Sequence, residues 1–528
     1  TGQPVPWAQS SAPPSPTASK PLAAAAAAAA SPPPPPPLRS AIGGGSSPPK
    51  RQRPLRAMVL PPPSVPPTAG ILRAARRTVV GAVQALAIKH FLSRSIRKGC
   101  LVLRLPDGRR RAFGDALCTD PDQIVAIRVY DWNFFVRVAL EYDLGLARGY
   151  MAGEWAVDGD TKYADGLRRL FLLFVLNRDA PSSGFKAGRL LLSWVGYTLN
   201  FVRYKLSLDN SLSGSRSNIH AHYDLSNDLF CTFLDKELMM YSSAIYDAEV
   251  DAVRPGHLAF KDTLESAQLR KVDTLLARAR VGPGHRLLDI GFGWGGISIR
   301  AAERFGCRVH GITLSIEQKK LAESRVRERG LENLITFELV DYRVFAKHHP
   351  GEFDRIISCE MIEAVGHNYL GTFFAAVERL LKPDGVFVME AITTPESRYA
   401  EYLRSTDFIN TIIFPGSCCP SLAALVNAMA TDRQALGPNK LSLESYDNIC
   451  MHYAETLRDW RYRFNDNEAA VRAQGFDATF IRCWNYYFTY CEAGFHSQTE
   501  GCLILTFSRP GNASLLPASE TRAIVGPR

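Results

Sequence analysis

The chain has 528 residues, of which 46% are hydrophobic and 22% charged, a composition typical of a globular protein with two or three domains. Its formal charge of +10 is uneven, because no Asp or Glu precedes Asp107 whereas 14 of the 62 Lys and Arg do. The remainder carries 48 basic against 52 acidic side chains, which argues against a nucleic-acid partner. The 11 cysteines form no CxxC pair, which excludes a zinc module or a disulfide scaffold and favours a reducing compartment.

Residues 1–68 are rich in Pro, Ala, Ser and Gly and are predicted to be a disordered low-complexity segment. The same acid-poor composition is typical of a plastid or mitochondrial transit peptide, so cytoplasmic and organellar locations are both expected alternatives. Residues 71–92 mix Arg with aliphatic residues and are predicted either to lie on an anionic membrane surface or to form a helix at a domain edge.

A small α+β domain is predicted over residues 69–195. Residues 101–105 resemble a strand followed by a Pro-Asp-Gly turn, and 126–143 resemble a strand followed by a helix. The apolar run 168–176 is too short to span a membrane and predicts a buried helix, and a further helix is expected at 188–203. No spanning helix and no metal site are predicted.

From about residue 265, strands alternate with helices, which predicts a mostly parallel, doubly wound Rossmann-like sheet. This catalytic domain is assigned to residues 196–512, followed by a tail at 513–528. The expected strands are 286–290, 308–313, 335–339, 353–359, 386–391 and 503–507, and the expected helices are 264–279, 295–305, 317–329 and 369–381.

The loop after the first of these strands is rich in glycine. Gly291, Gly293 and Gly296 satisfy the GxGxxG pattern of dinucleotide-binding loops, so a dinucleotide and S-adenosylmethionine are both considered. Asp289 at the strand end suits a cationic ligand with an α-amino group and suits a pyrophosphate poorly. The second strand leads into 311–315, which lacks the acid that would bind a dinucleotide ribose. These features favour S-adenosylmethionine.

Several motifs resemble the cyclopropane-fatty-acyl-phospholipid synthases and the related mycolic acid cyclopropane synthases. The similarity covers about residues 95–512. It rests on the loop 289–296, on 311–315 with Gln318, and on 363–367, and further matches lie at 222–230, 241–244, 413–416, 453–460, 490–495 and 507–512. The last of these is most similar to the synthase part of the plant enzymes. The resemblance implies a class I methyltransferase fold.

The resemblance also implies a reaction. A methylene group passes from S-adenosylmethionine to a cis double bond of a phospholipid acyl chain, through a carbocation that loses a proton to bound bicarbonate and closes to a cyclopropane. The alternative is a methyl or methylene branch without ring closure. Because an alkene is a weak nucleophile, the site must orient it and exclude water. The aromatic residues within 240–246 and 484–490 suit an apolar acyl tunnel.

The site residues follow from the same motifs. The cofactor contacts expected are Tyr241, Ser242, Asp289, Gly291, Gly293, Trp294, Gly295, Thr313, Leu314, Gln318, Asp341 and Tyr342. The catalytic candidates are Glu363, Tyr453, Cys491, Ser243, Ile392 and Glu390.

Among the catalytic candidates, Glu363 is expected to anchor bicarbonate and Tyr453 to hydrogen-bond it, whereas a structural role is favoured for Cys491. Ser243 and Glu390 depart from the bacterial pattern. A second carboxylate at Glu390 would repel bicarbonate unless one of the two carboxyl groups is protonated. The alternatives for Glu390 are that it is protonated, that it points away from bicarbonate, or that it indicates a different reaction.

The expected partners are an unsaturated phospholipid, a membrane surface bound peripherally and, from the resemblance, a second copy of the chain. Two competing hypotheses are a catalytically inactive lipid-binding protein and a dinucleotide oxidoreductase. The intact glycine loop and Glu363 favour an enzyme over the first.

Overall fold

The computed structural model describes residues 95–115, 124–178, 210, 225–250, 258–430, 440–512 and 515. The segments predicted at 1–68, 71–92 and 188–203 lie outside these residues, as does the tail beyond 515. Within the described part of the chain, no helix is both long and apolar enough to cross a membrane.

The N-terminal part forms a four-stranded sheet with the strand order β2-β1-β3-β4. The turn between β1 and β2 contains Gly108, whose φ of 82° needs a glycine. The helix α4 covers the apolar run predicted to be buried. These elements are β1 (Cys100–Arg104), β2 (Arg110–Gly114), β3 (Ile124–Val129), α3 (Asn133–Met151), β4 (Trp155–Val157) and α4 (Asp165–Arg178).

The larger sheet has seven strands in the order β12-β13-β11-β10-β7-β8-β9. The five strands from β7 to β11 are parallel, and β13 pairs antiparallel with both β11 and β12. The strands are β7 (Arg286–Ile290), β8 (Arg308–Thr313), β9 (Ile335–Leu339), β10 (Phe353–Cys359), β11 (Leu381–Thr393), β12 (Ser442–Asn448) and β13 (Gly501–Ser508). The predicted doubly wound, mostly parallel sheet is confirmed.

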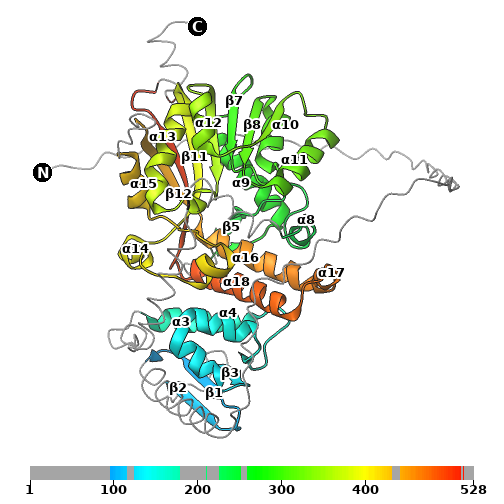
Figure 1. Ribbon diagram of the computed structural model, residues 1–528, viewed down its shortest axis with the longest axis vertical. Coiled ribbons are helices and arrows are strands. Elements are labelled where there is room, and N and C mark those ends of the chain that lie inside the picture. Colours follow the sequence, from blue (N-terminus) through cyan, green and yellow to red (C-terminus); the bar gives the residue numbers. More distant parts are fainter. Residues whose placement is uncertain are drawn as a thin grey trace, which may run out of the picture. The chain divides into compact units, whose positions relative to one another are not determined.

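Helices pack against this sheet (Figure 1). Alternating residues of one strand enter two separate clusters: Val386 and Val388 join one, Phe387 and Met389 the other. Both faces are therefore covered, as expected for near-continuous apolar strands. The helices beside the parallel strands are α9 (Leu264–Arg278), α10 (Gly296–Phe305), α11 (Ile316–Glu328), α12 (Tyr342–His348) and α13 (Leu370–Leu380).

Two long aromatic-rich helices, α16 and α18, carry the contacts between this domain and the N-terminal sheet. The ring of Tyr486 on α18 lies 5.8 Å from that of Tyr150 on α3 and 5.0 Å from that of Phe171 on α4. The remaining elements are α8 (Asn227–Phe230), β5 (Ala248–Val250), β6 (Leu258–Phe260), η3 (Ile362–Ala364), η4 (His367–Tyr369), α14 (Glu396–Tyr402), η5 (Ile409–Ile413), α15 (Leu422–Met429), α16 (Cys450–Asp466), α17 (Glu468–Ala473) and α18 (Ala478–His496).

The predicted strands at 286–290, 308–313, 335–339 and 353–359 have the predicted bounds. Three corrections apply elsewhere. The strand predicted at 386–391 spans Leu381–Thr393, because Leu381 already pairs with Phe353 across a register shift. The helix α12 was not predicted, since it has only seven residues. The strand β12 was not predicted either, because its burial pattern includes no fully buried residue, as suits an edge strand.

Candidate active site

A pocket opens at the carboxyl ends of β7, β8, β9 and β10. In the sheet order, β7 lies between β10 and β8, so the chain reverses its winding direction there, where open α/β sheets bind ligands. Ten of the predicted cofactor residues line this pocket: Tyr241, Ser242, Gly291, Gly293, Trp294, Thr313, Leu314, Gln318, Asp341 and Tyr342.

The glycine loop needs its glycines for two different reasons. Gly291 has φ +80°, and a Cβ there would lie 2.8 Å from Cγ of Met361. A side chain here would therefore force the loop away from Met361, which also lines the pocket. Gly295 also has a positive φ, but a Cβ there would meet Phe337 and Ala322, so it packs the loop against the fold and lies off the pocket wall.

Asp289, the other predicted cofactor residue off the pocket wall, is fully buried. Its Oδ2 accepts a hydrogen bond from Oγ of Ser298 on α10 at 2.7 Å. Burial raises the pKa of this carboxyl to about 7. The structure places Asp289 beneath the loop, where it ties β7 to α10, and a direct contact with the cofactor stays a prediction.

The far side of the pocket carries polar groups that suit a nucleoside. The Oγ1 of Thr313 donates to Oε1 of Gln318 at 3.4 Å, and the strand end is free of acidic residues, as predicted. Asp341 is the N-cap of α12, and its two carboxylate oxygens accept from the guanidinium of Arg343 at 2.8 and 2.7 Å. Contacts of Asp341 and Tyr342 with the adenine ring remain predictions. Both residues line the pocket, which is compatible with such contacts.

Glu363 lies in η3 and is 8% exposed. Its Oε1 accepts from the backbone N–H of Ile392 at 2.6 Å, which brings these two predicted residues together. Its Oε2 has no hydrogen-bond partner among the described residues. Burial raises the pKa of Glu363 to about 7. Glu363 is not among the residues that line the pocket.

Glu390, on β11, is fully buried and faces Lys271 of α9, with 3.5 Å between its Oε2 and the lysine Nζ. The thiol of Cys359 donates to the same oxygen at 3.4 Å. Lys271 also donates to Oγ of Ser242, a residue of the pocket wall. Burial lowers the pKa of Lys271, but the neighbouring Cys359 and Glu390 outweigh that effect and raise it. Lys271 therefore offsets the negative charge of Glu390.

Lys271 was missed by sequence analysis, although a signal was present. On α9, the positions of Leu264, Gln268, Lys271 and Leu275 form one buried face at helical spacing. A lysine inside such an apolar stripe needs a buried partner, which marks it as unusual. The sequence does not show which carboxylate it meets.

Glu360 was also missed, and it is the carboxylate that lines the pocket. It directly follows β10 and has φ +45°, a strained conformation for a residue other than glycine. Its Oε2 accepts from the hydroxyl of Tyr453 at 2.6 Å, and its Oε1 from the backbone N–H of Ser243 at 2.9 Å. Burial, followed by the charges of Glu390 and Glu363, raises the pKa of Glu360.

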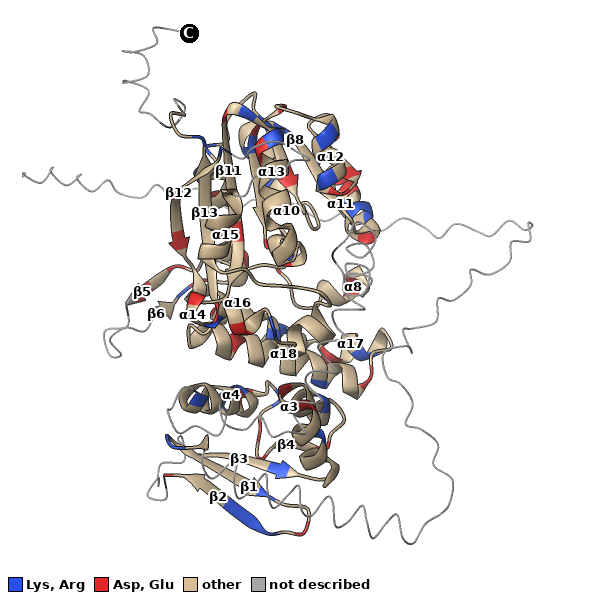
Figure 2. Cartoon of the chain, turned by 60° about the vertical axis from the view of Figure 1, so that its left-hand side comes forward, with Lys and Arg blue, Asp and Glu red and all other residues tan. Residues whose placement is uncertain are grey.

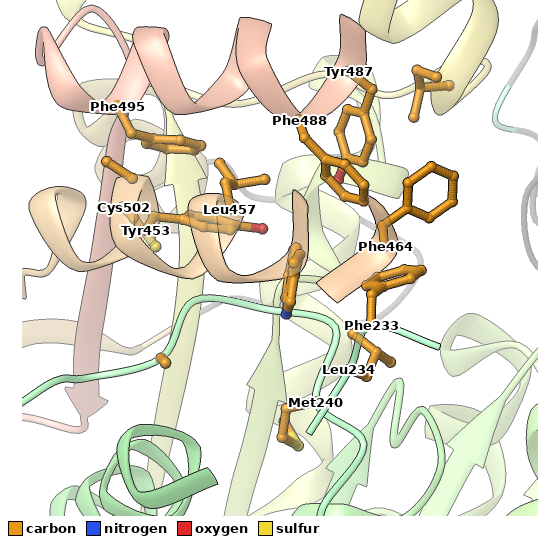
Figure 3. Close-up of a cluster of buried hydrophobic side chains, with 14 of the residues drawn as sticks. Phe233, Leu234, Met240, Tyr453, Leu457, Phe464, Tyr487, Phe488, Phe495 and Cys502 are labelled. Atoms are coloured by element: carbon orange, nitrogen blue, oxygen red, sulfur yellow. The ribbon is translucent and has the colours of Figure 1, made fainter. Parts of the chain in front are cut away.

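Tyr453 and Cys491 take different positions. The ring of Tyr453 on α16 stacks on Phe495 with 4.3 Å between the ring centroids (Figure 3). Its hydroxyl donates to Glu360. Cys491 on α18 lies off the pocket wall, and burial raises the pKa of its thiol. A raised pKa disfavours the reactive thiolate, in keeping with a structural role.

The predicted acyl tunnel falls on residues that pack as core. Phe233, Phe464 and Phe488 contact one another at ring-centroid distances of 5.5 to 6.3 Å in the cluster of Figure 3. The hydroxyl of Tyr241 donates to that of Tyr487 at 3.2 Å at the edge of this cluster. A tunnel there stays a prediction.

Comparisons with known proteins place this chain in a family. Residues 210–504 match the family of mycolic acid cyclopropane synthetases. Tuberculostearic acid methyltransferase UfaA1 of Mycobacterium tuberculosis is 37% identical over 356 residues, 67% of this chain and 76% of the relative. The cyclopropane-fatty-acyl-phospholipid synthase of Escherichia coli is 34% identical over 387 residues, 72% of this chain and 87% of the relative.

Among solved structures, the cyclopropane synthase MmaA2 from Mycobacterium tuberculosis covers 56% of this chain and 98% of its own, with 28% identity and a TM-score of 0.48. A second, of mycolic acid cyclopropane synthase CmaA1, holds S-adenosylhomocysteine and has 28% identity and a TM-score of 0.47, covering 56% of this chain and 98% of its own.

This chain is a class I S-adenosylmethionine-dependent methyltransferase, defined by its doubly wound sheet and its glycine-loop pocket. It belongs to the mycolic acid cyclopropane synthetase family. The S-adenosylmethionine interpretation of the loop is confirmed, and the dinucleotide alternative is set aside.

Proposed function

We propose that this enzyme transfers a one-carbon group from S-adenosylmethionine to a cis double bond in a phospholipid acyl chain and closes it to a cyclopropane. The observation that carries this proposal is a carboxylate, Glu360, on the wall of the cofactor pocket and backed by further buried carboxyls. Fixed negative charge in a dry site stabilises a developing cation. The name of the Escherichia coli relative supports the same substrate class.

The residues of this chain divide the work. The donor supplies an electrophilic methyl group at its sulfonium. The loop around Gly291 and the polar groups of Thr313 and Gln318 hold it at one end of the pocket, whereas Tyr241 and Trp294 offer apolar wall to the alkene. The alkene electron pair forms the new C–C bond, and the S–C bond breaks. The cation left on the chain must then lose a proton before water reaches it.

A second candidate function is methyl or methylene branching without ring closure. Its support is UfaA1, named for tuberculostearic acid, which is 37% identical to this chain. The second carboxylate at Glu390 also motivates this alternative, and Lys271 offsets the charge of that carboxylate.

The test incubates the enzyme with dioleoyl phospholipid and S-adenosylmethionine labelled with ¹³C in the methyl group. Mass spectrometry of the acyl chains after mild hydrogenolysis separates ring from branch, because only a strained ring opens. A ring in the labelled product is the expected result. A labelled branched chain without a ring selects the second candidate, and an unlabelled lipid rejects both.

The resemblance also implies a bicarbonate ion bound in the active site. The unpaired Oε2 of Glu363 would suit it. However, that oxygen lies off the pocket wall, the hydroxyl of Tyr453 already donates to Glu360, and Glu360 itself places a carboxyl group on the pocket wall. These residues do not fit a second anion, so no step is assigned to bicarbonate.

We also propose that the enzyme binds membranes peripherally and forms a homodimer. We further propose that it is located in the cytoplasm or in an organelle. The support for membrane binding is an acyl-chain substrate together with exposed arginines on β2, Arg110 and Arg111 (Figure 2). Size-exclusion chromatography with light scattering tests the dimer, for which a monomer at micromolar concentration is the contrary result.

A further inference from the structure

Three carboxyl side chains gather at the ends of β10 and β11, but they differ in access. Glu363 and Glu390 are buried and lie off the pocket wall. Glu360 is half-buried and lines the pocket together with the glycine loop. Among the three, only Glu360 is therefore placed to touch a substrate in this pocket.

The backbone at Glu360 is held in a conformation that a side chain disfavours. Its φ is +45°, and its N–H donates to the carbonyl oxygen of Glu390 at 2.9 Å. Because non-glycine residues rarely adopt this region, neighbouring contacts must enforce it. The effect is to aim the carboxyl from the end of β10 into the pocket.

Two donors fix the orientation of that carboxyl. The hydroxyl of Tyr453 meets Oε2 and the N–H of Ser243 meets Oε1, and Tyr453 is itself held by stacking on Phe495. Each bond favours the ionised carboxylate. Burial and the charges of Glu390 and Glu363 act in the opposite direction and raise the pKa of Glu360, which makes it a stronger base.

Lys271 limits the accumulated negative charge. Its Nζ lies 3.5 Å from Oε2 of Glu390, and Glu390 is the charge that acts most strongly on Glu360. Because Glu390 is paired with Lys271, less negative charge acts on Glu360. A base, a fixed orientation and access to the pocket thus coincide at one residue.

We propose that Glu360 is the general base that removes a proton from the transferred methyl group. This inference rests on the proposed function and deepens it. The electron pair of the methyl C–H bond forms the third C–C bond of the ring at the cationic carbon, and the proton moves to a carboxylate oxygen of Glu360. The proton leaves to water once the products have left the pocket. Glu360 thereby takes the role that the resemblance gives to bicarbonate.

The test compares wild type with Glu360→Gln, which keeps the shape and an acceptor for the Ser243 N–H but removes the base. Glu352→Gln, on the surface near His349, is the matched control and should behave as wild type. Buffers are freed of carbon dioxide and then supplemented with bicarbonate. Isothermal titration calorimetry measures the affinity of each variant for S-adenosylhomocysteine and so tests whether the cofactor pocket is intact.

For Glu360→Gln we expect ring formation to fall by at least about 100-fold while S-adenosylhomocysteine affinity stays within about threefold. Residual transfer should give methylated, hydroxylated chains, because water quenches a cation that keeps its proton. Wild type should need no bicarbonate. Glu360→Gln with ring formation within about threefold of wild type overturns the proposal, as does a wild-type requirement for bicarbonate.

A second variant covers a loss of folding. If Glu360→Gln fails to bind S-adenosylhomocysteine, the pH dependence of kcat/KM is measured for Glu360→Asp and for wild type instead. A base must be ionised, so wild-type kcat/KM should fall as pH drops through its pKa, and the Asp variant should shift that limb. An unshifted limb overturns the proposal. Wild type that labels no lipid at all is instead a failure of the proposed function.

Discussion

At the scale of single residues, the pair of Lys271 and Glu390 shows how charge is managed beneath the pocket. Both side chains are fully buried, with 3.5 Å between Nζ and Oε2. A buried pair contributes little net stability, but removal of one partner leaves an uncompensated charge. This difference can be measured.

Lys271→Met is expected to destabilise the fold by about 3 kcal/mol or more, because Glu390 is left unpaired. The double variant Lys271→Met/Glu390→Gln should recover most of that loss. Urea denaturation followed by fluorescence measures both. A single variant as stable as wild type would show that the pair is not formed.

Glu363 gives a pH dependence of stability. Its folded pKa of about 7 lies above that of an unfolded glutamate, so the folded state binds the extra proton between about pH 4.5 and 7. The contribution of Glu363 to stability therefore falls as pH rises through this window. Glu363→Gln keeps an acceptor for the N–H of Ile392 and removes the titration.

We expect the melting temperature of wild type, relative to Glu363→Gln, to decrease from pH 5 to pH 8. Differential scanning fluorimetry across that range measures it. Parallel pH curves for the two proteins would contradict a raised pKa at Glu363.

At the scale of elements, the loop between β7 and α10 depends on backbone conformations that the glycines permit. Gly291→Ala adds a Cβ at φ +80° and 2.8 Å from Met361, on the pocket wall. Gly330→Ala is a matched control, because it also has a positive φ, +66°, but meets nothing within 4 Å.

Gly291→Ala is expected to weaken S-adenosylhomocysteine binding by at least about tenfold, since the loop must shift to relieve the contact. Gly330→Ala should cost about 1 kcal/mol of stability and leave binding unchanged. Isothermal titration calorimetry measures the S-adenosylhomocysteine affinity of both variants. Equal affinities would exclude a specific role of the glycine loop in cofactor binding.

At the scale of the whole molecule, the N-terminal sheet and the catalytic domain meet through α18. Arg461 on α16 is fully buried and bridges Glu492 of α18 and Asp165 of α4, at 2.8 and 2.9 Å. This contact joins the two parts through a buried guanidinium, which pairs with a buried carboxylate at Glu492 and a partly exposed one at Asp165.

If β2 contacts the membrane, Arg110→Ala/Arg111→Ala should reduce binding to vesicles containing phosphatidylglycerol and leave turnover of detergent-dispersed lipid intact. Each basic residue near an anionic surface contributes about 1 kcal/mol, so the loss of two should weaken binding by about 2 kcal/mol, or about 30-fold. Vesicle flotation measures the binding, and Arg308→Ala is the surface control. If the double variant floats as well as wild type, β2 is not the part of the enzyme that contacts the membrane.

The sequence alone determined the alternation of strands and helices, the glycine loop and ten residues of the pocket wall. These are local features, because strand periodicity, glycine positions and motif order are written along the chain. The tertiary structure decided the rest. Only folding brings Lys271 of α9 beneath Glu390 of β11, and Tyr453 of α16 against Glu360. Burial and charge at these contacts depend on neighbours far apart in sequence, and only the fold shows which carboxylate lines the pocket.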